Sequence, residues 1–239
     1  MSQKQLLLNK LKPSTKPLNL PYNNFLDLWE DISVLYGKKL AVHDEYSGVS
    51  LTYELFYKTI KSIGAALQFL GLKKGDHVSL FSENCAPWLL IDQAIQISGM
   101  VNAVRGSQSP LEELAYIYKH SDSKALIVDH YDIYKNLKPS LDRSCVKFVV
   151  CLLGDVPENE PDVLSFQYLT DLGAQKSFTP HPINLDEPAT IVYTSGTTGY
   201  PKGVVLTNKN FISQMLFIKR RLKLSNFEKR NFNIFILFA

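Results

Sequence analysis

Ten consecutive residues, 194–203, combine the residue types that bind phosphate groups. They include three glycines, four Ser or Thr hydroxyls and one lysine, and they lie between two apolar segments, 189–193 and 204–206. Glycines let backbone amides approach phosphate oxygens closely, and hydroxyl groups add further hydrogen bonds. Lys202 would supply a positive charge for a polyphosphate. We therefore predict a phosphate-binding loop with contacts from Thr194, Ser195, Gly196, Thr197, Thr198, Gly199 and Lys202.

The Walker A loop, G-x-x-x-x-G-K-[ST], is the obvious comparison for this segment, and the match fails at two positions. Pro201 stands where the second glycine is required, and Gly203 stands where the Ser or Thr is required. The amide before the lysine and the hydroxyl that binds magnesium are therefore both missing. This disfavours a P-loop kinase or GTPase. A hairpin loop that is merely rich in turn residues is the alternative without a ligand, and the match of ten residues in type and order favours phosphate binding.

The sequence T-S-G-T-T-G-Y-P-K-G at 194–203, followed by an apolar strand and Thr-Asn, resembles the phosphate-binding signature of the adenylate-forming enzymes. These include acyl-CoA synthetases, the adenylation domains of peptide synthetases and luciferases. The segments 52–55 (T-Y-E-L), 71–78 (G-L-K-K-G-D-H-V) and 82–84 (S-E-N) resemble the N-terminal subdomain of the same enzymes. The segment 104–117 is similar to the branch of long-chain fatty acid CoA ligases and acyl–acyl-carrier-protein synthetases.

This resemblance implies ATP-dependent activation of a long-chain fatty acid. The carboxylate would attack the α-phosphate of ATP to give an acyl-adenylate and pyrophosphate, and a thioester would then form with CoA or acyl carrier protein. ATP and Mg²⁺ are the implied cofactors, and the protein ligand of the metal is expected outside this chain. Ser195, Thr197, Thr198 and Lys202 would cancel charge on the β- and γ-phosphates.

The resemblance extends over approximately residues 22–225. The family's adenine-binding segments, interdomain hinge and C-terminal catalytic lysine lie beyond residue 239, so we assign no catalytic residue here. We expect a truncated chain, an N-terminal fragment of such an enzyme. A non-catalytic remnant that lacks the C-terminal motifs is the alternative.

Along the chain, segments with apolar residues at helical intervals alternate with short β-branched segments. These predict the helices and strands that would position the loop. Strand–helix–strand order predicts an α/β fold with a mostly parallel sheet flanked by helices, and the resemblance makes it the incomplete N-terminal portion of the adenylate-forming enzyme fold. The expected strands are 40–43, 49–52, 77–81, 101–104, 125–128, 146–152, 189–193 and 204–206. The expected helices are 24–36, 52–70, 87–97, 109–119, 131–137 and 166–172. Asn24 and Thr52 can cap helices, and Ser109 with Glu112 can form a capping box.

Three regions are predicted along the chain. Residues 1–23, which are punctuated by prolines, form an extended arm, residues 24–225 form a partial N-terminal AMP-binding domain, and residues 226–239 form a divergent tail. Within the domain, the proline-rich segment 154–188 is expected to be a long surface connection with one short helix.

Composition excludes several classes of protein. The 239 residues are 45% apolar and 21% charged, as in an ordinary globular chain, and a net charge of +3 is too small to indicate a nucleic-acid partner. Three cysteines without a C-x-x-C pair disfavour a disulfide framework and a zinc site, and the five histidines lack metal-ligand spacing. No apolar run approaches the length of a membrane span, which favours a cytoplasmic protein that is peripheral on a membrane at most.

Three further features leave alternatives open. A basic cluster at residues 219–230 is either a solvated face or a surface for a membrane or an acidic carrier protein. Arg105, at a predicted strand end, is either a site residue or a surface arginine paired with Glu112 or Glu113. Cys85 has no histidine partner and is expected to be a small buried residue.

Overall fold

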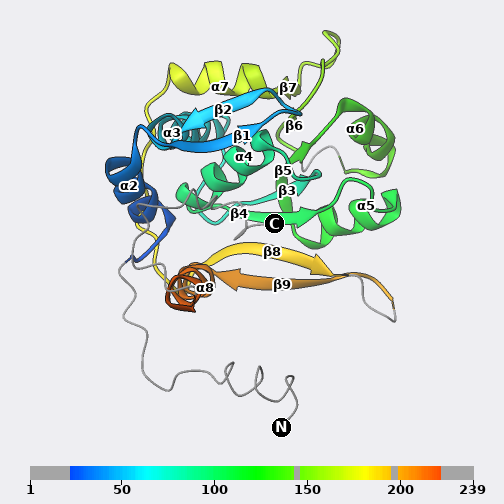
Figure 1. The fold of residues 1–239 in the computed structure, drawn as a ribbon. Coiled ribbons are helices and arrows are strands. Elements are labelled where there is room, and N and C mark those ends of the chain that lie inside the picture. Colours follow the sequence, from blue (N-terminus) through cyan, green and yellow to red (C-terminus); the bar gives the residue numbers. More distant parts are fainter. Residues whose placement is uncertain (1–21, 143–145, 195–198, 222–239) are drawn as a thin grey trace.

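A seven-stranded sheet forms the centre of the fold in the computed structural model, which describes residues 22–142, 146–194 and 199–221 (Figure 1). The strand order is β7-β6-β5-β3-β4-β8-β9, and all neighbours are parallel except β8 and β9. The strands are β3 (His77–Phe81), β4 (Val101–Arg105), β5 (Ser123–Val128), β6 (Val149–Cys151), β7 (Val163–Ser165), β8 (Pro188–Thr194) and β9 (Lys202–Thr207). A separate antiparallel pair consists of β1 (Leu40–Asp44) and β2 (Val49–Thr52). The predicted α/β fold with a mostly parallel sheet is confirmed.

Helices cover both faces of the sheet. One face carries α2 (Phe25–Tyr36), α3 (Tyr53–Phe69), α4 (Ala86–Ile97) and α7 (Phe166–Ala174). The opposite face carries α5 (Leu111–His120) and α6 (Tyr131–Leu137), which is followed by a short 3₁₀ turn, η1 (Lys138–Ser140). The last described helix, α8 (Asn208–Arg221), follows β9 and packs its Phe211 edge-on against Phe25 of α2. None of the helices in the described part of the chain is long and apolar enough to cross a membrane.

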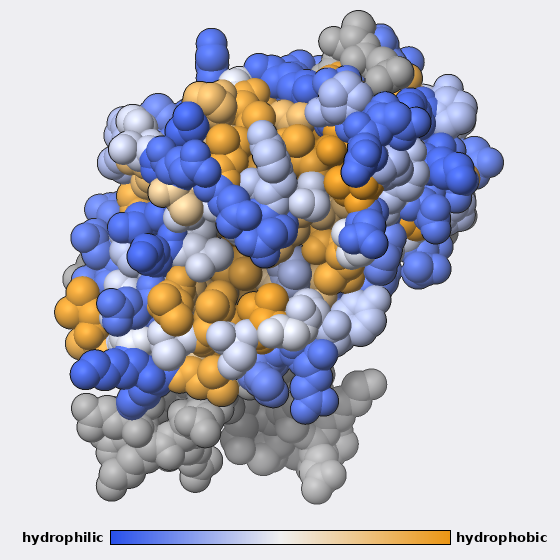
Figure 2. All heavy atoms as spheres, turned by 90° about the horizontal axis from the view of Figure 1, so that it is seen from above, coloured by the Kyte–Doolittle hydropathy of each residue, from blue (hydrophilic) through white to orange (hydrophobic). Residues whose placement is uncertain are grey.

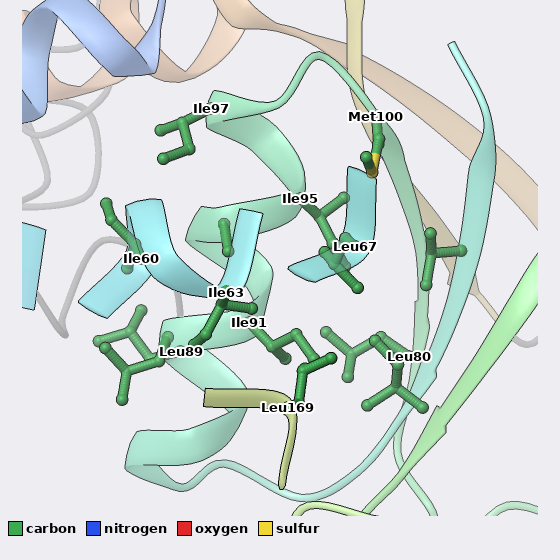
Figure 3. Close-up of a cluster of buried hydrophobic side chains, with 14 of the residues drawn as sticks. Ile60, Ile63, Leu67, Leu80, Leu89, Ile91, Ile95, Ile97, Met100 and Leu169 are labelled. Carbon is green, nitrogen blue, oxygen red and sulfur yellow. The ribbon is translucent and has the colours of Figure 1, made fainter. Parts of the chain in front are cut away.

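The larger core lies between α3, α4 and the sheet (Figure 3). Ile63 of α3, Ile91 of α4 and Leu80 of β3 are completely buried there, and Leu169 of α7 closes the cluster. Helix α4 is buried on nearly all sides, because it lies between the sheet and α3, and nine of its twelve residues are apolar. Only Trp88 of its twelve residues is not buried.

Two of the predicted helix caps are confirmed. The side chain of Asn24 accepts a hydrogen bond from the backbone N–H of Asp27 at 3.0 Å. The hydroxyl of Thr52 accepts one from the backbone N–H of Leu55 at 3.4 Å. Each cap satisfies an amide that has no partner within its helix, which fixes where α2 and α3 begin.

The predicted capping box at the start of α5 is wrong. The helix begins at Leu111, Pro110 occupies the cap position, and no side chain caps it. Proline has no hydroxyl or carboxyl group with which to accept a hydrogen bond from the first amides. Ser109 therefore lies one residue outside the cap, and its own N–H donates to the carbonyl of Gly106 at 3.2 Å.

The segment 154–188 differs in part from its expected form. The short helix is confirmed as α7, but the three residues before it form β7, which pairs in parallel with β6 at the end of the sheet. A strand of three residues is too short to display alternation, so the prolines around it suggested a loop instead. The arm predicted over 1–23 lies outside the described residues up to residue 21, and the predicted tail 226–239 lies outside them entirely.

Exposed apolar side chains occur at several places in the described part of the chain, and Figure 2 shows apolar surface between hydrophilic side chains on one face. At the end of the sheet, Val204 is 47% exposed and Val205 is 53% exposed. Because consecutive residues of a strand point to opposite faces, neither face of β9 is fully covered there.

We therefore expect the folded chain to bind the dye 1-anilinonaphthalene-8-sulfonate, since exposed apolar side chains offer it a site. Replacing Val204 and Val205 together by threonine, which keeps the β-branched shape, should lower the fluorescence of the bound dye. The measurement is a dye titration below the unfolding temperature. Fluorescence no higher than that of the dye in buffer would contradict the expectation.

Candidate functional site

The predicted loop lies at the edge of the sheet where parallel strands end. Strand β8 ends at Thr194, strand β9 begins at Lys202, and these two residues face each other in the ladder. Since β8 runs parallel to β4, its carboxyl end shares an edge with the carboxyl ends of β3, β4 and β5 (Figure 1). Ligands of open α/β sheets bind at this edge. Residues 199–201, the described residues directly before β9, are called the β8–β9 turn below.

Three of the seven predicted contact residues belong to the described part of the chain. Thr194 is exposed at the end of β8, Lys202 is exposed at the start of β9, and Gly199 lies in the turn. Ser195, Gly196, Thr197 and Thr198 lie outside the described residues.

Gly199 has the backbone conformation that favours glycine, with φ at +114°. A Cβ built on this residue would meet no atom within 4 Å. The conformation therefore requires glycine, while the space beside the backbone stays open to a ligand. Together with the exposed amino group of Lys202, this arrangement can accept an anion.

The end of β8 beneath the turn is held by Arg105. Pairing between β4 and β8 extends from Asn102↔Thr190 to Val104↔Val192 and stops there. One position further on, Arg105 Nη1 donates a hydrogen bond to the carbonyl of Tyr193 at 3.0 Å, so a side chain continues the contact between the strands.

The partner of Arg105 is Glu113 of α5, whose Oε1 lies 2.6 Å from Arg105 Nε. The expected pairing with one of the two glutamates is found, but Arg105 is partly buried and is not the surface arginine of that interpretation. The pair is only about one fifth exposed, at 23% for Arg105 and 17% for Glu113, so solvent screens it less than a surface pair. The pair links α5 to the strand that leads into the turn.

The hydroxyl end of Tyr193 has a second partner on α5. His120 Nδ1 and Tyr193 Oη form a hydrogen bond of 2.8 Å. Burial, assisted by the nearby Tyr116, raises the pKa of Tyr193 above its usual value, so the phenol stays neutral and keeps its proton for hydrogen bonding.

An aromatic contact reaches the turn itself. The ring of Tyr200 stacks on the ring of Tyr116, with centroids 4.6 Å apart and planes inclined by 19°. Tyr116 in turn stacks on His120, with centroids 5.1 Å apart. These contacts were not predicted from the sequence, because the spacing of Tyr116 and His120 on a helix does not tell which strand lies beside it.

A family model described as AMP-binding enzyme matches residues 30–235. This match covers most of the chain. The chain belongs to the AMP-binding enzyme family.

Two curated relatives are about one third identical to this family member over the residues that they match. A long-chain-fatty-acid–acyl-carrier-protein ligase of Arabidopsis thaliana is 32% identical over 213 residues, which cover 81% of this chain and 29% of the relative. The probable acyl-activating enzyme 16 of the same plant is 32% identical over 236 residues, covering 87% of this chain and 33% of the relative. The chain thus spans about a third of the length of these relatives.

Among solved structures, a long-chain-fatty-acid-CoA ligase from Archaeoglobus fulgidus superimposes with a TM-score of 0.74 and 25% identity. The superposition covers 90% of this chain and 43% of that one. The fold is therefore that of the N-terminal part of an adenylate-forming enzyme, as the resemblance implied.

An acidic group lies at the same edge in this AMP-binding family member. Ser107, after β4, donates a hydrogen bond to Asp129 Oδ2 at 2.5 Å, after β5. Gly106 leaves room for Glu83, because a Cβ there would lie 2.9 Å from Glu83 Oε1. The described residues contain no group of three or more His, Cys, Asp or Glu that is arranged to hold a metal ion.

The two described cysteines are buried free thiols. Burial raises the pKa of Cys85, and it raises the pKa of Cys151 to about 12. A thiol must ionise to act as a nucleophile, so neither residue is suited to covalent catalysis. The expectation for Cys85 is confirmed. The side chains of the basic cluster at residues 219–230 lie outside the described residues.

Proposed function

We propose that this chain supplies the phosphate-binding part of an enzyme that activates a long-chain fatty acid with ATP. The observation that carries the proposal is the pairing of an open, glycine-dependent backbone at Gly199 with an exposed cation at Lys202, at the carboxyl edge of the sheet. The names of the curated relatives, one of them a long-chain-fatty-acid–acyl-carrier-protein ligase, support the fatty-acid substrate. The acceptor would be CoA or acyl carrier protein.

Activation is needed because a carboxylate is a poor acyl donor, whose leaving group would be oxide. In the proposed reaction a carboxylate oxygen attacks the α-phosphorus of ATP, and the bond to the β-phosphate oxygen breaks. Pyrophosphate leaves with the electron pair, and the acyl-adenylate remains. A thiol then attacks the acyl carbon, AMP leaves, and the thiol proton passes to solvent.

The contribution of this chain is to hold the leaving phosphates. Lys202 would place a positive charge where negative charge collects on pyrophosphate, and the backbone at Gly199 would allow phosphate oxygens to approach closely. We propose the same role for the hydroxyls and amides of Thr194, Ser195, Gly196, Thr197 and Thr198. We assign no described residue to the magnesium ion that would accompany ATP, and we derive no step through it.

Lys202→Ala is expected to weaken ATP binding about tenfold or more, because a hydrogen bond to a charged group contributes about 1.5–3 kcal/mol. Isothermal titration of ATP into the chain would measure this. Lys209→Ala is the matched control, since it removes the same charge at an exposed position beyond the far end of β9. Equal affinities for ATP in the two variants would refute the assigned role of Lys202.

Gly199→Val should reduce ATP affinity at least as much as Lys202→Ala. A β-branched side chain disfavours the positive φ of this residue and fills the space that a phosphate would use. Gly48→Val is the matched control, because Gly48 in the β1–β2 turn also has a positive φ of +71° and open space around its Cβ position.

Both glycine variants should lose similar stability, and only Gly199→Val should lose ATP affinity. Thermal unfolding and ATP titration of the same samples separate the two effects. Loss of ATP affinity in both variants would point to general damage and count against a phosphate site at Gly199.

A further inference from the structure

One face of helix α5 is directed at the end of β8 and at the turn that follows it. Glu113, Tyr116 and His120 are spaced i, i+3 and i+7, which places them on a single side of the helix. Glu113 holds Arg105, which donates to the Tyr193 carbonyl, and His120 bonds the Tyr193 hydroxyl. Tyr116 lies between them in the sequence and contacts the turn.

The contact of Tyr116 is with Tyr200, which lies one residue after Gly199 and two before Lys202. Tyr200 is 71% exposed, so it is not part of a core, yet its ring lies nearly parallel to that of Tyr116 at 4.6 Å. Tyr116 is backed by His120 at 5.1 Å, and His120 is fixed by its bond to Tyr193. We call Tyr200, Tyr116 and His120 the aromatic column.

We infer that Tyr116 is a positioning residue for the β8–β9 turn, which it holds through the ring of Tyr200 so that Lys202 is presented to a polyphosphate. That the ligand is a polyphosphate rests on the proposed function. That Tyr116 holds the turn rests only on the contacts of the aromatic column.

The position of the column explains why an exposed aromatic residue has a defined partner. The pairing of β4 with β8 ends at Val192, so this ladder does not extend to the described residues of the turn. Arg105 and His120 fix Tyr193, which precedes the turn, through hydrogen bonds. The Tyr116–Tyr200 stack supplies an aromatic contact to α5 at this point, next to Pro201, which is buried.

Stacked aromatic pairs stabilise by an amount that corresponds to about a 3- to 10-fold change in an equilibrium. Tyr116→Ala and Tyr200→Ala should each speed amide hydrogen exchange at residues 199–203, where every residue except Pro201 has an amide, by about that factor in the absence of nucleotide. They should weaken ATP binding by a similar factor. Tyr116→Phe and Tyr200→Phe should restore both values, because stacking does not need the hydroxyl.

Two controls separate positioning from general stability. Tyr46→Ala removes a tyrosine that is 72% exposed in the β1–β2 turn and should change neither quantity. The double variant Tyr116→Ala/Tyr200→Ala should behave like either single variant, because each alone abolishes the stack. Unfolding midpoints in urea show whether the exchange is local.

The outcomes distinguish this inference from the proposed function. Unchanged exchange at residues 199–203 in the alanine variants would overturn the anchoring, and faster exchange with unchanged ATP affinity would overturn the positioning role. A wild-type chain that binds no ATP would overturn the proposed function, while the exchange rates would still decide whether Tyr116 holds the turn.

Discussion

Gly173→Ala is expected to destabilise the fold by about 3 kcal/mol, at the upper end of the cost of adding a methyl group to a packed interior. A Cβ on Gly173 would lie 1.9 Å from the carbonyl oxygen of Ser62 and 2.5 Å from its carbonyl carbon. Both are backbone atoms of α3, which cannot rotate away as a side chain can. Helices α3 and α7 must therefore separate, and the core around Leu169 must open with them.

Urea unfolding would measure this loss, with Gly64→Ala as the comparison. A Cβ on Gly64 would meet side-chain atoms, Ser98 Oγ at 2.8 Å and Phe178 at 2.9 Å, which can shift at smaller cost. Both variants gain about 1 kcal/mol of helix propensity relative to glycine, so the difference between them reports the steric effect. A Gly173→Ala variant as stable as Gly64→Ala would show that α7 is not packed as described.

The wild-type chain is expected to become less stable as the pH rises, because Asp92 is buried. Asp92→Asn is expected to abolish this dependence on pH. Burial inside α4 raises the pKa of Asp92 from 3.8 to about 6, although three side-chain amides donate hydrogen bonds to it. The folded state therefore holds this proton to a higher pH than the unfolded state does. The stabilising effect is complete below about pH 4 and is lost as the pH rises through about 6.

About two pKa units correspond to about 3 kcal/mol, and this sets the size of the expected difference. Between pH 4.5 and pH 7.5, the unfolding free energy of Asp92→Asn relative to wild type should rise by up to this amount. The buried acceptors Gln96 Oε1 and Asn102 Oδ1 have no partner among the described residues, and the amide that Asp92→Asn introduces can donate to one of them after rotation. Asparagine is therefore a reasonable substitute for the protonated acid.

Denaturant titrations at several pH values test this prediction. Asp155→Asn, at an exposed position, removes the same charge and should follow the wild-type profile. Trp29 donates to Gln93 at 2.7 Å, so its fluorescence should report rearrangement around Asp92. Parallel profiles for wild type and Asp92→Asn would show that the carboxyl is not held neutral by burial.

Sequence patterns predicted several elements closely. The strand 77–81 and the helix 131–137 have their predicted limits, and the caps at Asn24 and Thr52 have their predicted partners. The failures have local causes. Strand β7 is too short for a periodic signal, and at α5 the proline in the cap position mattered more than the Ser–Glu spacing.

The sequence allowed the residues of the candidate site to be predicted, but not the contact of the turn with α5. The composition of 194–203 indicated phosphate chemistry, and Glu113 was one of two expected partners for Arg105. The contact between Tyr116 and Tyr200 depends on β8 lying beside β4 rather than beside β7, the strand that precedes it in the chain. Spacing along a sequence does not encode that neighbourhood.

The placement of β8 also bears on the order in which the molecule folds. Thr190 bonds the carbonyl of Asn102, a residue 88 positions earlier, whereas β3, α4, β4, α5 and β5 are joined by short connections. Closing the longer loop costs more chain entropy, so the β8–β9 hairpin is expected to dock onto a sheet that has already formed. Its surroundings, α5 included, are then in place before Lys202 arrives. The proposed affinity for ATP would accordingly appear only in the last step of folding. ATP binding would then report that the hairpin has docked.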